Sequence, residues 1–135
     1  MNKKANLLVS LISIVDDDQS VRESTTNLLK SNGFRAEVFS SAEDFLASNY
    51  LDETKCLILD VQMPGMNGLE LQRRLASEHR CIPIIFIFAH DNQQVRKQAT
   101  RSGAIDFLPK PFSEEALLRA IRAALGMANE NLRPL

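Results

Sequence analysis

The sequence is short of several kinds of residue, and each shortage narrows the class of protein. It has only two cysteines, Cys56 and Cys81, and no CxxC pair. This usage is typical of buried, reduced thiols, which we expect in a reducing cytosol. The formal net charge is -1, so there is no bulk electrostatic case for binding nucleic acid. No internal repeat, low-complexity segment or second domain is evident.

Long apolar runs are also missing. The run over residues 7–15 (LLVSLISIV) is too short for a transmembrane helix. It follows two lysines, as the apolar part of a signal peptide would, but three aspartates come after it instead of a small-residue cleavage pattern. We therefore expect no membrane segment. We interpret residues 1–9 as a tail, followed by a first buried strand.

What the chain does have is an alternation of strand-like and helix-like segments. The predicted strands are Leu11–Val15, Phe34–Phe39, Cys56–Asp60, Ile84–Phe88 and Ala104–Leu108. Five helical segments follow them, with expected starts at Asp18 or Ser20, at Ser41, near Leu69, at Asp91 and at Ser113. Three of the strands are uniformly apolar, which indicates a parallel sheet covered on both faces. The fold class is therefore α/β, a doubly wound sandwich in one domain over residues 10–126, with residues 127–135 as a tail or the start of a linker.

Four polar residues and one aromatic residue cluster where the predicted strands end. Asp16, Asp17, Asp60, Phe88 and Lys110 all lie at or just past carboxyl ends of strands, so we expect them around one crevice. Crowded carboxylates repel one another, and a hard divalent ion such as Mg²⁺ relieves that repulsion. A lysine adds a second positive charge. Together these groups favour a site for a phosphoryl group, in which a carboxylate can act as the nucleophile.

Three motifs carry a resemblance to a known family. They are residues 14–18 (IVDDD), residues 59–68 (LDVQMPGMNG) and residues 107–112 (FLPKPF). In this order they resemble the receiver domain of bacterial two-component response regulators, over about residues 11–125. The closest likeness is to nitrogen-fixation-type regulators, in which a helix-turn-helix DNA-binding output domain follows the receiver. The resemblance implies a flavodoxin-like sheet with strand order 2-1-3-4-5.

The resemblance also implies roles for individual residues. Asp60 would accept phosphate from the phosphohistidine of a sensor histidine kinase, and Lys110 would pair with the phosphoryl oxygens. Mg²⁺ would be held by Asp17, by Asp60, by the carbonyl of Gln62 and, through a water, by Asp16. The bond between Lys110 and Pro111 is a candidate cis peptide. Such a domain is a cytoplasmic signalling module, not a conventional enzyme, although it catalyses its own phosphorylation and dephosphorylation.

One position departs from the family pattern. Phe88 stands where receivers have a Thr or Ser whose hydroxyl contacts a phosphoryl oxygen. A benzyl group makes no such bond, and it fills space into which the family's aromatic residue, here Phe107, is thought to swing. We therefore expect the phosphorylation chemistry to survive while its coupling to the output surface is weakened or rewired. That surface spans about residues 92–101, 104–108 and 114–125, and its mixed charges allow either a homodimer or a solvated face.

Three other functions differ from this one in the residues that they need at this site. A pseudo-receiver, which is an interaction module that switches without phosphate, stays open because of Phe88. A metal-dependent phosphatase would need a second acid two residues after the nucleophile, where Gln62 stands. A flavin-binding electron carrier would need a phosphate-binding loop after the first strand, where three aspartates would repel the phosphate. Contact with DNA would require an output domain that the sequence does not contain, so we expect a stand-alone receiver or a fragment ending in a linker.

Overall fold

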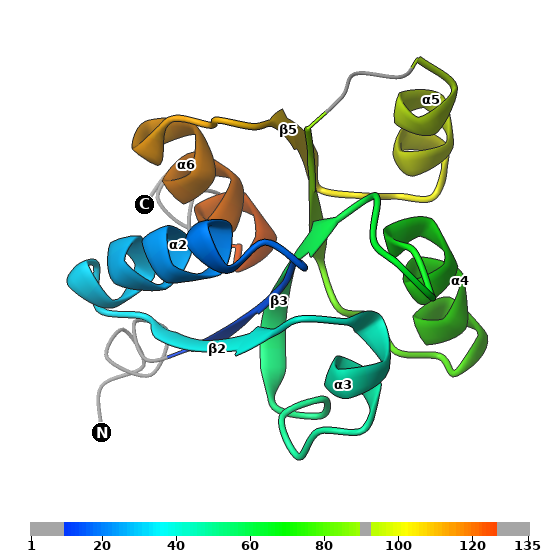
Figure 1. Cartoon of the computed structure of the whole chain (residues 1–135), viewed down its shortest axis with the longest axis horizontal. Helices are drawn as coiled ribbons and strands as arrows, with labels where there is room; N and C mark the ends of the chain where they lie inside the picture. Colours follow the sequence, from blue (N-terminus) through cyan, green and yellow to red (C-terminus); the bar gives the residue numbers. More distant parts are fainter. Residues whose placement is uncertain (1–9, 90–92, 127–135) are drawn as a thin grey trace, which may run out of the picture.

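A computed structural model describes residues 10–89 and 93–126 as a five-stranded parallel sheet with helices on both faces (Figure 1). The strands are β1 (Leu11–Val15), β2 (Arg35–Phe39), β3 (Thr54–Asp60), β4 (Ile84–Phe88) and β5 (Asp106–Pro109). The helices are α2 (Gln19–Ser31), α3 (Ala42–Leu46), α4 (Gly68–Ser77), α5 (Gln93–Arg101) and α6 (Glu114–Ala124). The order in the sheet is β2-β1-β3-β4-β5, which confirms the predicted fold class and strand order.

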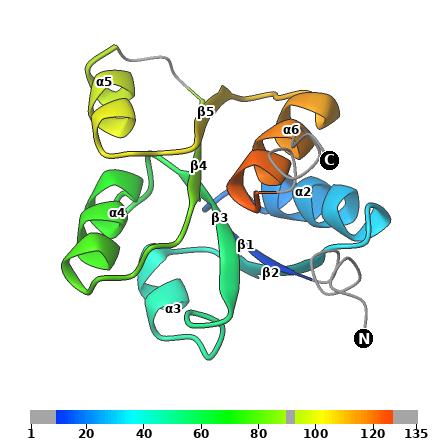
Figure 2. The same cartoon turned by 180° about the vertical axis from the view of Figure 1, so that it is seen from behind.

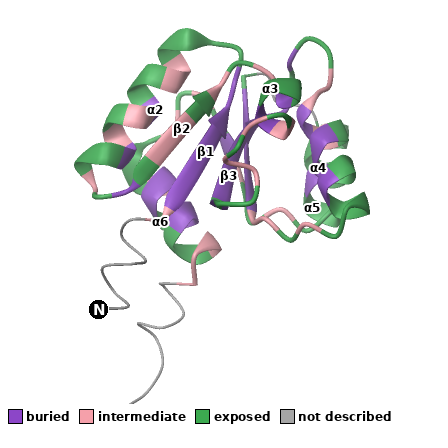
Figure 3. Ribbon diagram, turned by 90° about the horizontal axis from the view of Figure 1, so that it is seen from below, coloured by how far each residue is buried: buried purple, intermediate pink, exposed green. Residues whose placement is uncertain are grey.

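The helices form two layers around the sheet. Helices α2 and α6 cover one face, and α3, α4 and α5 cover the other, as the two opposite views show (Figures 1 and 2). All residues of β1 and β4 are buried, and so are the last five of β3. Figure 3 shows this buried centre, with the more exposed β2 at the edge. The apolar runs form strands because both of their faces are covered.

Alternation along the strands divides the core in two. Isoleucines at one set of alternate positions, including Ile14, Ile58 and Ile85, pack beneath α2 and α6. Their neighbours, including Leu59 and Phe86, pack beneath the other three helices. Because successive side chains of a strand point to opposite faces, one apolar run supplies both cores.

Side-chain caps begin four of the helices. The Asp18 carboxylate accepts a hydrogen bond from the Ser20 amide at the start of α2, so Asp18, and not Ser20, is the cap. Ser41 and Ser113 cap α3 and α6, as predicted. Helix α4 begins with a reciprocal pair between Asn67 and Glu70, a capping box that the sequence reading missed. These caps fix where the chain leaves each loop beside the carboxyl edge of the sheet.

Several sequence expectations need correction. Strand β5 begins at Asp106 and not at Ala104, because the Ala104 amide still donates to the Ala99 carbonyl at the end of α5. Strand β3 begins two residues earlier than predicted, at Thr54. Cys56 is buried, but Cys81 is exposed in the loop before β4.

Some predictions fall outside the described residues. They are the two tails, residues 1–9 and 127–135, and the helix start at Asp91. Within residues 10–89 and 93–126, no helix is both long and apolar enough to cross a bilayer.

Candidate functional site

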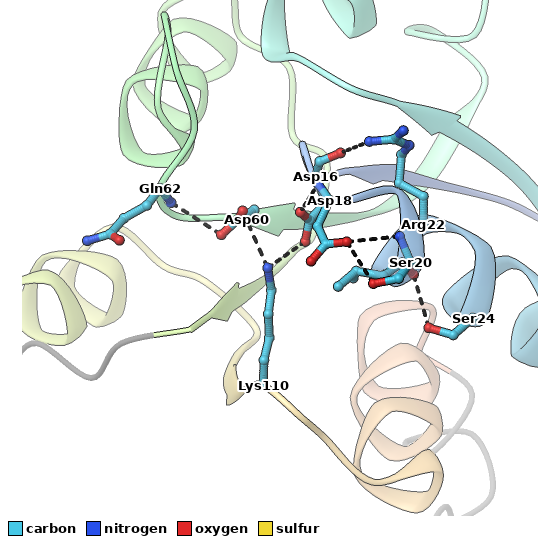
Figure 4. A network of polar contacts seen from close by, with 9 residues as sticks. Asp16, Asp18, Ser20, Arg22, Ser24, Asp60, Gln62 and Lys110 are labelled. Atoms are coloured by element: carbon cyan, nitrogen blue, oxygen red, sulfur yellow. Dashed lines mark hydrogen bonds and ion pairs between the residues drawn. The ribbon is translucent and has the colours of Figure 1, made fainter.

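The polar residues at the strand ends meet in one place. One carboxylate oxygen from each of Asp16, Asp17 and Asp60 lies within 4.8 Å of the others. The Lys110 Nζ lies 2.8 Å from Asp16 Oδ2 and 3.4 Å from Asp60 Oδ2 (Figure 4). Three segments contribute: the turn after β1, the end of β3 and the loop after β5. The structure therefore gathers the three acids and the lysine that the sequence predicted would converge.

Asp16 is the most constrained of the acids. It is completely buried, and its amide donates to the Phe39 carbonyl at the end of β2. Its Oδ1 accepts a hydrogen bond from the Asp18 amide at 2.9 Å, and its backbone carbonyl accepts one from Arg22 Nη1 at 2.7 Å. Asp17, the next residue, is exposed. The turn thus holds one acid inside and presents the other to solvent.

Asp60 ends the central strand β3 and is only 4% exposed. Burial, together with the nearby Asp16 charge, raises the pKa of Asp60 to about 7, against the opposing effect of Lys110. Burial by itself would lower the pKa of Lys110, but its contacts with Asp16 and Asp60 outweigh that and raise it. The lysine therefore stays an ammonium, while Asp60 is an acid that gains from further positive charge.

The donor set fits a hard divalent cation. All three carboxylates offer oxygen atoms to one small volume, and the pKa of Asp60 is raised there first by burial and then by the charge of Asp16. Gln62 lies next to them, and its amide donates to Asp60 Oδ1 at 3.3 Å. The Gln62 side chain extends away from Asp60 (Figure 4), which leaves the backbone as the part of Gln62 near the site.

The loop after Asp60 is held by two contacts that the sequence did not reveal. A Cβ atom on Gly68 would lie 2.4 Å from the Asp60 carbonyl oxygen, so α4 can begin this close to β3 only with glycine. From α3, Glu43 Oε2 accepts a hydrogen bond from the Met66 amide at 3.0 Å, which lowers the pKa of Glu43. A contact across so many residues leaves no local pattern by which to predict it.

Phe88 and Phe107 lie beside the site, on neighbouring strands. Phe88 is 4% exposed, and its ring centroid lies 4.4 Å from that of the half-buried Phe107. The Arg96 guanidinium of α5 lies over both rings, 5.5 Å and 5.4 Å from their centroids. The Phe88 carbonyl also accepts a hydrogen bond from the Lys110 amide. The two aromatic rings therefore connect the edge of the acidic site to α5 through Arg96, whose contact with the rings could not be foreseen from the sequence.

The final bond of the site region also matches expectation. The peptide between Lys110 and Pro111 is cis.

Comparison with known proteins gives matches over most of the chain. The family model for the response regulator receiver domain matches residues 12–122. The response regulator protein TmoT of Ectopseudomonas mendocina is 50% identical over 119 residues, 88% of this chain and 54% of TmoT. The transcriptional regulatory protein FixJ of Azorhizobium caulinodans is 37% identical over 122 residues, 90% of this chain and 58% of FixJ.

Solved structures agree with these relatives. The response regulator StyR is 47% identical with a TM-score of 0.80, covering 90% of this chain and 61% of that chain. The structure called FixJ-N is 36% identical with a TM-score of 0.77, covering 93% of this chain and 97% of that chain. This chain spans about half the length of the curated relatives it matches.

Proposed function

The chain belongs to the response regulator receiver domain family, and from this premise we propose that Asp60 accepts a phosphoryl group from a sensor histidine kinase. One observation carries the proposal: the Asp60 carboxylate lies among Asp16, Asp17 and Lys110 at the carboxyl edge of the sheet. Phosphoryl transfer depends on positioning and charge neutralisation, and this group of side chains supplies both.

The transfer follows from the chemistry of these side chains. One Asp60 oxygen forms a bond to phosphorus while the bond from phosphorus to the kinase histidine nitrogen breaks, and the nitrogen keeps the electron pair and takes up a proton. Lys110, fixed by Asp16, neutralises charge on the phosphoryl oxygens. Mg²⁺, when bound, supplies further charge neutralisation. Asp17, Asp60 and the Gln62 carbonyl would hold that ion directly, and Asp16 would hold it through a water.

Intact-mass measurement tests the acceptor. Incubation of the chain with acetyl phosphate and Mg²⁺ should add one phosphoryl group, and Asp60→Asn should abolish the adduct. Chelation of Mg²⁺ should slow its formation strongly. Asp52→Asn, at an exposed acid before the start of β3 and so at the opposite end of that strand from Asp60, is the matched control and should react as wild type does. An adduct that persists in Asp60→Asn, or no adduct on wild type, would refute the assignment.

Phe88 supports the second part of the proposal, that phosphorylation is coupled to the output surface in an altered way. Without a hydroxyl at this position, no side-chain bond from Phe88 to a phosphoryl oxygen can form. Instead Phe88 contacts Phe107, and both lie under Arg96 of α5. We propose Phe88 and Phe107 as switch residues that respond through this stacked group.

Two substitutions at one position separate the hydroxyl from the ring. Phe88→Thr supplies the hydroxyl and removes the ring, whereas Phe88→Leu only removes the ring. We expect Phe88→Thr to increase the effect of phosphorylation on dimerisation and on Phe107 ring mobility, measured by light scattering and aromatic NMR. If Phe88→Thr behaves as wild type in both, the altered coupling is wrong.

The alternative function is a pseudo-receiver that binds a partner without phosphate, and the buried aromatic contact at Phe88 is the observation that favours it. The acetyl phosphate experiment decides between the two, because a pseudo-receiver would show no adduct. A homodimer through α5, β5 and α6 is proposed from the mixed charges there, which are positive at Arg96, Lys97 and Arg101 and negative at Asp106, Glu114 and Glu115. Contact with DNA would belong to an output domain outside this chain.

A further inference from the structure

Arg22 contacts the acidic site without a part in the chemistry above. It lies near the start of α2, and its side chain reaches back over the turn, where Nη1 donates to the Asp16 carbonyl at 2.7 Å (Figure 4). The residue is half-buried. Its guanidinium is therefore hydrogen-bonded to the turn between β1 and α2.

The location of Arg22 calls for an explanation beyond the helix itself. The positive end of the helix dipole disfavours a cation near the N-terminus, and although the Asp18 carboxylate caps α2, its first turn has no acidic residue to pair with Arg22. The compensating contacts lie outside the helix, at the Asp16 carbonyl and beside the acidic turn. The position of Arg22 is therefore explained by its hydrogen bond to this turn and not by a stabilising effect on α2.

The contacted carbonyl belongs to the peptide unit that joins Asp16 to Asp17. Because a peptide unit is planar, a bond that fixes its oxygen also fixes the orientation at which the next residue leaves. The other polar groups of Asp16 are already held, its amide by Phe39 and its carboxylate by Asp18 and Lys110. Asp17 is exposed, and the backbone fixes the direction of its Cα–Cβ bond, from which the carboxylate rotates among its rotamers.

We propose that Arg22 is a positioning residue, which fixes the peptide between Asp16 and Asp17 so that Asp17 faces the cation site. The part that concerns the cation rests on the proposed function. Two effects of Arg22 oppose each other, since its charge repels a cation while its hydrogen bond orients a ligand. The charge is near the surface, where solvent screens it, and the bond is short and direct. The orienting effect is therefore the larger.

Magnesium titration of the full chain, followed by NMR, measures the outcome. Arg22→Met should weaken Mg²⁺ binding by about three- to tenfold, which is at or below the usual effect of removing a group that supports a metal ligand. Arg22→Lys, which keeps a charge and a donor, should recover part of that loss. Arg73→Met, at an exposed arginine of α4, is the matched control and should bind as wild type does. Equal or tighter binding by Arg22→Met would overturn the proposal.

A second measurement needs no metal. With a chelator present, the order parameter of the Asp17 backbone amide should fall in Arg22→Met and stay unchanged in Arg73→Met. If wild type fails to bind Mg²⁺, the proposed function fails, but this amide still decides the role of Arg22. An unchanged Asp17 amide in Arg22→Met would show that the bond positions nothing.

Discussion

Burial makes the ionised form of Asp60 unfavourable in the folded chain, with a consequence for stability. The pKa of Asp60 is raised from 3.8 to about 7, so the folded state binds this proton more tightly than the unfolded state does. The resulting stabilisation is fully present below about pH 4 and is lost as the pH rises through 7. The asparagine variant carries no such ionisation.

Because Asp60 ionises and an asparagine does not, the two residues should contribute differently to stability as the pH changes. Without Mg²⁺, we compare the free energy of unfolding of Asp60→Asn with that of wild type. The variant's value minus the wild-type value should be about 2 kcal/mol larger at pH 8 than at pH 5. Urea unfolding in the presence of a chelator measures the difference. The same advantage at both pH values would mean that Asp60 is not perturbed in the way described.

Single residues also show where sequence reading succeeds. Asp16, Asp17, Asp60 and Lys110 could be placed because each follows a strand that can be recognised, and parallel strands end at one edge. Arg22 and Glu43 could not be placed in this way. Their contacts depend on how far a flexible side chain reaches across a loop, which no periodic pattern encodes.

At the scale of elements, the close approach of β3 and α4 is the feature most open to test. Gly68→Ala places a methyl group against the Asp60 carbonyl, so α4 or the strand end must move. We expect a loss of about 1–3 kcal/mol in the free energy of unfolding, from urea titration, together with weaker Mg²⁺ binding.

Gly33→Ala provides the control for that prediction. Gly33 has a positive φ of 86° but open space around its Cβ position, so the substitution strains the backbone without a collision. It should destabilise the chain and leave Mg²⁺ binding unchanged. If the two substitutions affect Mg²⁺ binding equally, the approach of α4 to Asp60 does not shape the site.

Elements differ in how well the sequence predicted them. The apolar strands β1 and β4 have the predicted bounds because burial on both faces demands continuous apolar residues. Strand β5 was placed too early, since Ala104 is apolar but its amide still completes the end of α5. Composition could not distinguish a helix ending from a strand beginning.

For the molecule as a whole, the two cysteines report on folding. Cys56 is buried in the sheet, and burial raises the pKa of its thiol to about 12, whereas Cys81 is exposed. Ellman's reagent should therefore react quickly with one thiol in the native chain and with two in denaturant. Cys81→Ser should leave almost no fast reaction in the native chain. Two fast thiols in the native state would mean that the sheet opens readily at β3.

The ion pair between Asp16 and Lys110 joins the first strand to the loop after the last one. Its two partners are among the earliest and latest described residues that the ribosome makes. A chain that is only partly synthesised can bring its acidic residues together only without Lys110, the lysine that pairs with Asp16. The proposed phosphoryl-accepting site is therefore complete only after the residues that follow β5 have been made.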